Sequence, residues 1–152
     1  MQQSNNIGMK NASCMGFSQG TGHLWIGDLK GNVHIFNPAN GFEKVESKEV
    51  SRKKICQIIP LTGEGAQIAT FDGIGEICVW DAGSREKAFS LRAQRDEVLA
   101  AGITADGQHI YSASNDNTLY HFDRTGDKVK EKHIKTPHEG KVTNFLAINP
   151  SD

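Results

Sequence analysis

The chain has 152 residues, 37% of them hydrophobic and 23% charged, and its formal net charge at pH 7 is −1. Its 17 basic and 18 acidic residues form no long run of one sign, so the charge pattern favours neither nucleic acid nor a membrane surface as a partner. No apolar run approaches the roughly 20 residues that span a bilayer, and residues 1–10 lack the apolar core of a secretory signal, so we expect an intracellular, cytoplasmic protein.

Residues 1–11 are rich in Gln, Asn and Ser and have no hydrophobic period, which predicts a flexible lead-in. A first group of four strand patterns follows, and turn residues separate its members. The four patterns lie at 12–17, 24–27, 32–36 and 42–50. The small residues of the first pattern suit a position where several strands converge, and the last pattern is polar enough for an outer, exposed strand.

The same order of strand patterns then recurs. The second group lies at 55–59, 66–71, 77–80 and 87–91, and the third at 98–103, 109–113, 119–122 and 128–134. A further apolar run at 142–148 begins a fourth group. Both faces of the strand at 77–80 are apolar, which predicts a sheet packed against each face rather than a sheet with one solvated side.

Each complete group contains a turn residue, a short apolar strand and an aromatic residue near the strand's end. The three segments are Gly31–Asn37, Gly75–Asp81 and Asn117–Asp123. Their aromatic residues, Phe36, Trp80 and Phe122, lie 44 and 42 residues apart. A repeat of slightly more than forty residues in which each unit contains a turn, an apolar strand and an aromatic residue near the strand's end is typical of the four-stranded blades of a β-propeller. The chain resembles the WD-repeat β-propellers in these segments, and the likeness extends over about residues 12–152.

We therefore expect an all-β chain of consecutive four-stranded antiparallel blades, forming part of a divergent WD-repeat-like propeller. Blade one is expected at 12–50, blade two at 51–92, blade three at 93–135 and the start of blade four at 136–152. A closed ring needs at least about four blades. The remaining blades are therefore expected from a longer chain or from a second copy.

The resemblance implies a hydrogen-bonded set in each blade: a His before the first strand, a Ser or Thr in the second, an Asp in the following turn and a Trp ending the third. Blade three matches this set in part. It has Ser112 or Ser114 and also Asp116, but Gln94 stands at the His position and Phe122 at the Trp position.

Blade two has Trp80, but Ile74 falls at its Asp position, and His138 fits the His position of blade four. These departures predict blades held mainly by apolar packing. The residues expected to have structural roles are Phe36, Trp80, Asp116 and Phe122.

The loops that enter successive blades should lie on one rim, the surface on which many members of this family hold peptides. Arg52, Lys53 and Lys54 lie in such a loop. They could contact a small anion or an acidic peptide, and the alternative is an ordinary solvated loop. The equivalent loops of the next blades contain Gln94, Arg95, Asp96, His138 and Glu139.

The sequence gives little support to catalysis or metal binding. His133 and His138 are five residues apart and a loop that contains a proline separates them, so solvent-facing strand and loop histidines are a better interpretation than a zinc site. The chain has three cysteines, Cys14, Cys56 and Cys78. An odd number of widely spaced cysteines favours reduced core thiols over disulfides or a metal site. No nucleophile–base pair or pair of carboxylates can be placed in one site. We expect no enzyme activity, no cofactor and no metal.

The most direct hypothesis is a non-enzymatic scaffold for protein–protein interaction, with a protein or peptide partner, no nucleic acid and no insertion into a membrane. The alternative is an accessory propeller segment of a larger signalling protein. It rests on the run at 24–36, which looks like blades in propellers attached to inositol phosphatases, Rho exchange factors and some kinases.

Overall fold

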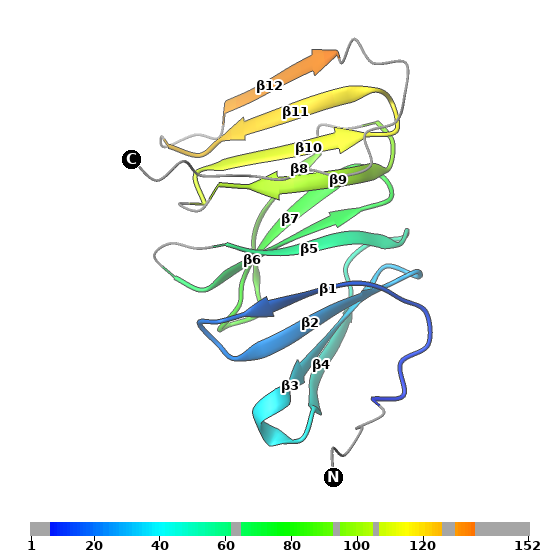
Figure 1. Cartoon of the computed structure of the whole chain (residues 1–152), viewed down its shortest axis with the longest axis vertical. Helices are drawn as coiled ribbons and strands as arrows, with labels where there is room; N and C mark the ends of the chain where they lie inside the picture. The colour runs from blue at the N-terminus through cyan, green and yellow to red at the C-terminus, as the bar shows by residue number, and fades with distance from the viewer. Residues whose placement is uncertain (1–6, 62–64, 93–94, 105–106, 126–129, 136–152) are drawn as a thin grey trace.

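A computed structural model describes residues 7–61, 65–92, 95–104, 107–125 and 130–135; within 130–135 it describes the side chains of Lys130 and Lys132 only. The strands of the described residues form three four-stranded antiparallel sheets, each in chain order (Figure 1). Blade one comprises β1 (Ala12–Ser18), β2 (His23–Asp28), β3 (Asn32–Asn37) and β4 (Glu43–Glu49), with the short 3-10 helix η1 (Pro38–Asn40) between its last two strands. Blade two comprises β5 (Ile55–Leu61), β6 (Gln67–Asp72), β7 (Glu76–Asp81) and β8 (Lys87–Arg92). Blade three comprises β9 (Val98–Ile103), β10 (His109–Ser114), β11 (Thr118–Asp123) and β12 (Lys130–Lys135).

The predicted all-β fold of consecutive four-stranded blades is confirmed. Each strand expected up to residue 135 is present, because turn residues and alternating apolar positions mark strands locally. The expected strand at 142–148 lies outside the described residues. In the described part of the chain, no helix is long and apolar enough to cross a membrane.

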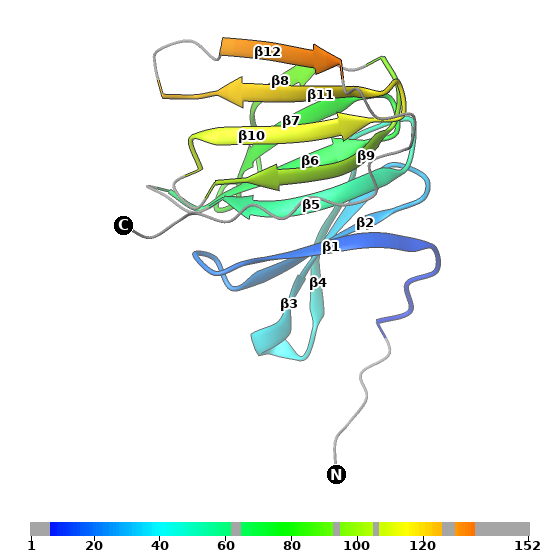
Figure 2. The same ribbon diagram turned by 45° about the horizontal axis from the view of Figure 1, so that its top comes forward.

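The three blades follow one another in chain order, with their first strands side by side (Figures 1 and 2). Polar side chains link these inner strands. The amide of Gln57 on β5 accepts a hydrogen bond from the backbone N–H of Ala101 on β9 (2.8 Å) and donates one to its carbonyl oxygen (3.1 Å). The hydroxyl of Ser13 on β1 donates to the carbonyl oxygen of Ile55 on β5 (2.6 Å).

Two apolar clusters hold the blades together. In the first, Trp25 and Ile35 of blade one pack with Ile55 and Ile68 of blade two, and all four are 0% exposed. The second lies between blades two and three and includes the equally buried Phe71, Val79, Ile110 and Phe122. Burying side chains of this size stabilises the fold by roughly 1.5–3 kcal/mol each.

Strand β7 contributes to both clusters. Ile77 and Val79 face blade three, whereas Cys78 and Trp80 face blade one. The prediction that both faces of this strand are covered is therefore confirmed.

Blade two has Ile74 at the expected Asp position, and another residue supplies the carboxylate of its turn. Asp72, two residues before Ile74, organises the β6–β7 turn, and Asp28 does the same in blade one. In both turns Oδ1 accepts hydrogen bonds from the backbone N–H groups two and four residues later, at 2.8–3.0 Å. Blade three uses Asp116, whose Oδ1 accepts from the backbone N–H of Thr118 (3.0 Å). A carboxylate at the end of the strand can reach the same turn amides, so the family spacing was not required.

Buried polar pairs supplement the apolar packing in blade two. Trp80 Nε1 donates to Thr70 Oγ1 (2.9 Å), and Ser51 Oγ donates to Asp72 Oδ2 (2.6 Å). Ser51 is 8% exposed and the other three residues are at most 5% exposed. An unpaired polar group at such depth would destabilise the fold, so these hydrogen bonds avoid that cost.

Candidate binding site on the entry rim

The loops that enter the blades share one end of the molecule with the turns between the second and third strands, and we call this surface the entry rim. Backbone hydrogen bonds join each loop to a turn. The carbonyl oxygen of Gly31 accepts from the N–H groups of Val50 and Ser51, both at 3.0 Å, and Gly73 N–H donates to the carbonyl oxygen of Lys54 (2.9 Å). In blade three the N–H of Asn115 donates to the carbonyl oxygen of Glu97 (2.9 Å). The contacts of Gly31 cross from blade one to blade two, and an ion pair between Lys54 and Glu97 crosses from blade two to blade three, so the rim is continuous across both boundaries.

A hollow of about 460 Å³, which we call the rim hollow, lies on this surface. Its lining comes from the β2–β3 turn of blade one, from the entry loop and β6–β7 turn of blade two, and from the entry loop of blade three. The lining residues are Leu29, Lys53, Lys54, Gly73, Asp96 and Glu97. The structure thereby brings together three of the predicted rim residues, Lys53, Lys54 and Asp96. Arg52 lines a neighbouring hollow instead.

The charges of the rim hollow are partly paired. Lys54 forms an ion pair with Glu97, and the hydrogen bond between them raises the pKa of the Lys54 ammonium despite its partial desolvation. The carboxylate of Asp96 accepts a hydrogen bond from Asn115 Nδ2 (2.9 Å). The side chains of Arg52 and Lys53 form no ion pair with any residue that the structure describes. Lys53 is therefore the exposed cation that the hollow can offer to a ligand.

Sequence reasoning missed three residues of the rim hollow, Leu29, Gly73 and Glu97. Leu29 is 54% exposed in the turn between two polar residues, Asp28 and Lys30. An apolar residue at the tip of a polar turn was the available signal. Glu97 follows the predicted Asp96, but its pairing with Lys54 depends on the packing of blade three on blade two, which no local pattern shows.

The other predicted residues lie elsewhere. The backbone N–H of Arg95 donates to Asp116 Oδ2 (3.4 Å), so both lie on the entry rim beside the hollow. Gln94, His138 and Glu139 lie outside the described residues. Phe36, Trp80 and Phe122 are at most 5% exposed and belong to the interior of the blades.

The opposite rim has a hollow of different character. It has about the same volume, 470 Å³, and lies between blades one and two only. Its apolar lining includes Phe17, Pro60, Leu61 and Ala66, and the other lining residues carry no charge. It therefore offers no charged group to orient a ligand.

The thiols are poor candidates for chemistry. All three cysteines are free, and desolvation by burial raises the pKa of Cys56 and of Cys78 to about 12 and that of Cys14 above its usual value. Thiols with such pKa values carry little of the reactive thiolate at neutral pH. Among the described residues, no three His, Cys, Asp or Glu side chains gather as metal ligands. The His133 side chain and His138 are not among those residues.

No protein-family model matches the chain, and no curated protein matches it. Solved structures do. The WD40 repeats of RRP9 match at a TM-score of 0.74 and 14% identity, over 88% of this chain and 41% of that one. A chain of the mitotic checkpoint complex matches at 0.71 and 19% identity, over 87% and 39%. The computationally designed Ika4 protein matches at 0.78 and 15% identity, over 98% and 89%.

The chain thus spans about two fifths of the length of the first two of these structures and nearly the whole of the third. At these identities the matches show the fold. It is the fold of consecutive WD40-type propeller blades.

Proposed function

We propose that this chain acts as a scaffold that binds an acidic segment of a protein partner at the rim hollow of a WD-repeat-like propeller. The observation that carries this proposal is the lining of the hollow, in which six residues from the loops and turns of three blades meet in one depression. Rigid blades can hold such loops in a fixed relative geometry, which lowers the entropic cost of binding. At the rim hollow the mechanism is binding alone and needs no cofactor.

The chemistry of the hollow supports an acidic partner. Lys53 is exposed and forms no ion pair with the described residues, whereas the acids of the hollow are already engaged, Glu97 by Lys54 and Asp96 by Asn115. A partner carboxylate can therefore pair with Lys53. An adjacent apolar side chain of the partner can pack on Leu29, which is more than half exposed.

The chain would act within a larger ring. It spans about two fifths of the matched natural proteins, so the remaining blades would come from a longer chain or a second copy. The free cysteines support a reducing compartment such as the cytoplasm. The alternative role, as an accessory segment of a signalling protein, gains no support from the matches above and remains a prediction.

The test is a selection from a displayed library of random 12-residue peptides, followed by fluorescence anisotropy on the enriched sequences. We expect enrichment of Asp and Glu next to an apolar residue. Lys53→Glu should weaken binding of these peptides about tenfold, because one favourable charge pair becomes a repulsive one. The affinity should also fall with added salt.

The matched control is Lys132→Glu, the same charge reversal at an exposed lysine of β12 on the outer edge of blade three. It should leave the affinity unchanged. Equal losses of affinity in the two variants would show a general effect of net charge and would contradict a specific role for Lys53. Enrichment without acidic residues, or binding that survives Lys53→Glu, would overturn the proposal.

A further inference from the structure

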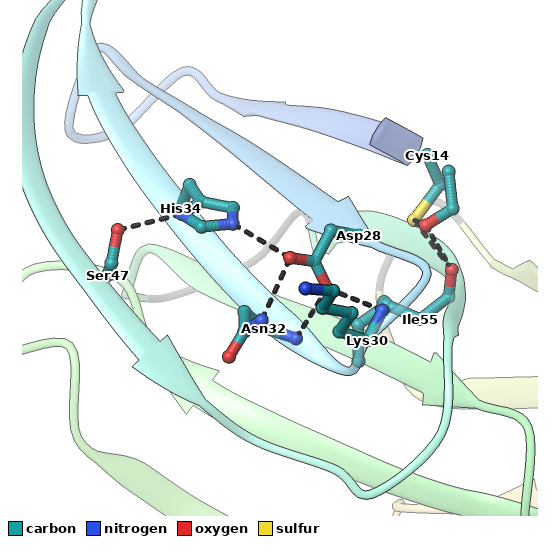
Figure 3. Close-up of polar contacts among 8 residues, drawn as sticks. Cys14, Asp28, Lys30, Asn32, His34, Ser47 and Ile55 are labelled. Carbon is teal, nitrogen blue, oxygen red and sulfur yellow. Dashed lines mark hydrogen bonds and ion pairs between the residues drawn. The ribbon is translucent and has the colours of Figure 1, made fainter. Parts of the chain in front are cut away.

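A chain of three hydrogen-bonded side chains lies on blade one and includes none of the residues that line the rim hollow. Val33 and Ile35 of β3 belong to the cluster between blades one and two. Successive side chains of a strand point to opposite faces, so His34 lies on the face of blade one that blade two does not cover. There His34 lies between Asp28 and Ser47 (Figure 3).

Strand register brings these residues together. His34 is the direct cross-strand partner of Ser47 on β4, and His34 Nδ1 lies 2.7 Å from Ser47 Oγ. Asp28 ends β2, next to the turn that leads into β3. Its Oδ2 lies 3.1 Å from His34 Nε2.

The surroundings of Asp28 fix the direction of these hydrogen bonds. Burial alone would raise the pKa of this carboxyl group, but hydrogen bonds from Asn32, from His34 and from the backbone N–H of Lys30 outweigh it and lower the pKa to about 2. Asp28 is therefore an anion at neutral pH and can only accept. In the neutral imidazole, His34 then carries its hydrogen on Nε2, which leaves the Nδ1 lone pair to accept the hydroxyl hydrogen of Ser47.

The exposure of the three side chains suits a reactive serine. Ser47 is exposed, whereas the side chain of His34 is 16% exposed and that of Asp28 is 9% exposed. A hydroxyl that donates to an imidazole, which in turn donates to a buried carboxylate, is the order of hydrogen bonds that activates serine nucleophiles on unrelated folds. Here the two imidazole nitrogens exchange places, with Nδ1 toward Ser47 and Nε2 toward Asp28.

We propose that Ser47 is a base-activated nucleophile that accepts acyl groups from activated esters. Ser47 Oγ attacks the ester carbonyl carbon while its proton passes to His34 Nδ1. The bond to the leaving oxygen then breaks, and His34 returns the proton to the departing alkoxide. Water hydrolyses the acyl-serine by the same transfer, so the net reaction converts ester and water into acid and alcohol. Asp28 is a positioning residue that orients the imidazole.

Blade two contains a natural control for this proposal. Ser90 on β8 is the cross-strand partner of Cys78, as Ser47 is of His34, and both serines are exposed. Asp72 stands where Asp28 stands in blade one. Ser90 thus has the same place in its blade but a buried, protonated thiol in place of the imidazole.

The experiment exposes the whole chain to a fluorophosphonate probe and quantifies the labelled peptides by mass spectrometry. General-base assistance contributes about 10²- to 10⁴-fold, so Ser47 should label at least about a hundredfold faster than Ser90. His34→Gln should reduce the labelling of Ser47 to the rate of Ser90. Hydrolysis of p-nitrophenyl acetate should fall in parallel in His34→Gln and in Ser47→Ala.

Ser47→Ala removes only an exposed hydroxyl, so its circular dichroism spectrum and unfolding midpoint should match those of the parent chain. Similar labelling of Ser47 and Ser90 would refute the proposal. Labelling of Ser47 that persists in His34→Gln would also refute it, since the imidazole would then have no part in the activation. Neither result would bear on peptide binding at the rim hollow.

Discussion

The substitution Gly31→Ala adds one methyl group where blade one packs against blade two, and so tests that packing. Gly31 lies in the β2–β3 turn with φ +90°, and a Cβ there would lie 2.1 Å from the carbonyl oxygen of Ser51 and 2.6 Å from that of Lys53. These atoms belong to the backbone and cannot rotate away. Moving them would also disturb the two hydrogen bonds that the Gly31 carbonyl oxygen accepts from Val50 and Ser51.

The expected cost of Gly31→Ala has three parts. A positive φ costs an alanine about 1 kcal/mol. Overpacking against immobile backbone adds roughly 1–3 kcal/mol, and the disturbed hydrogen bonds add about 1 kcal/mol. The free energy of unfolding should therefore fall by about 3–5 kcal/mol, a large share of the 5–15 kcal/mol typical of a domain. The turn itself tolerates a side chain, because Asn117 in the corresponding turn of blade three has φ +61°.

The assay is urea unfolding followed by the fluorescence of Trp25 and Trp80, which are both buried. Gly41→Ala is the matched control, since Gly41 has φ +66° and a Cβ there would have nothing within 4 Å. It should cost only the part due to φ, about 1 kcal/mol. Equal losses in the two variants would refute the close approach of the blade-one turn to the entry loop of blade two.

Two further predictions concern titration. The pKa of Asp28 is about 2 in the fold, below its unfolded value of about 3.9, so its contribution of about 2 kcal/mol is present above pH 4 and lost as the pH falls toward 2. Urea unfolding of the parent chain and of Asp28→Asn should therefore converge by about that amount between pH 5 and pH 2, and a constant difference would contradict the assignment. Cys56 and Cys78 should react with a disulfide reagent at pH 7.5 far more slowly in the folded chain than in urea, and equal rates would contradict their burial.

Most of the fold can be predicted from local patterns in the sequence. Turn residues and apolar alternation mark each strand, and the spacing of Phe36, Trp80 and Phe122 marks the repeat. The turn carboxylate of blade two was missed because the family spacing points to Ile74, which has none. Asp72 was visible at the end of the preceding strand pattern, and the hydrogen-bonding reach of its side chain was sufficient reason to consider it.

The sites depend on contacts that no local pattern shows. The three basic residues of the blade-two loop are adjacent in sequence, but only the fold pairs Lys54 with Glu97 and leaves Lys53 available. Likewise, the sequence suggested no nucleophile–base pair. Ser47 meets His34 through the β3–β4 register, which includes an irregularity between Ile35 and Phe36 that cannot be read from residue types.

The most direct test of a binding site on the entry rim is an NMR titration of the isotope-labelled chain with an acidic peptide from the selection. We predict that backbone amide shifts change at Leu29, Lys53, Gly73 and Glu97, residues that come from three blades and share one hollow. Changes concentrated around Phe17 and Ala66 would place the ligand in the apolar hollow of the opposite rim and would contradict the proposed function.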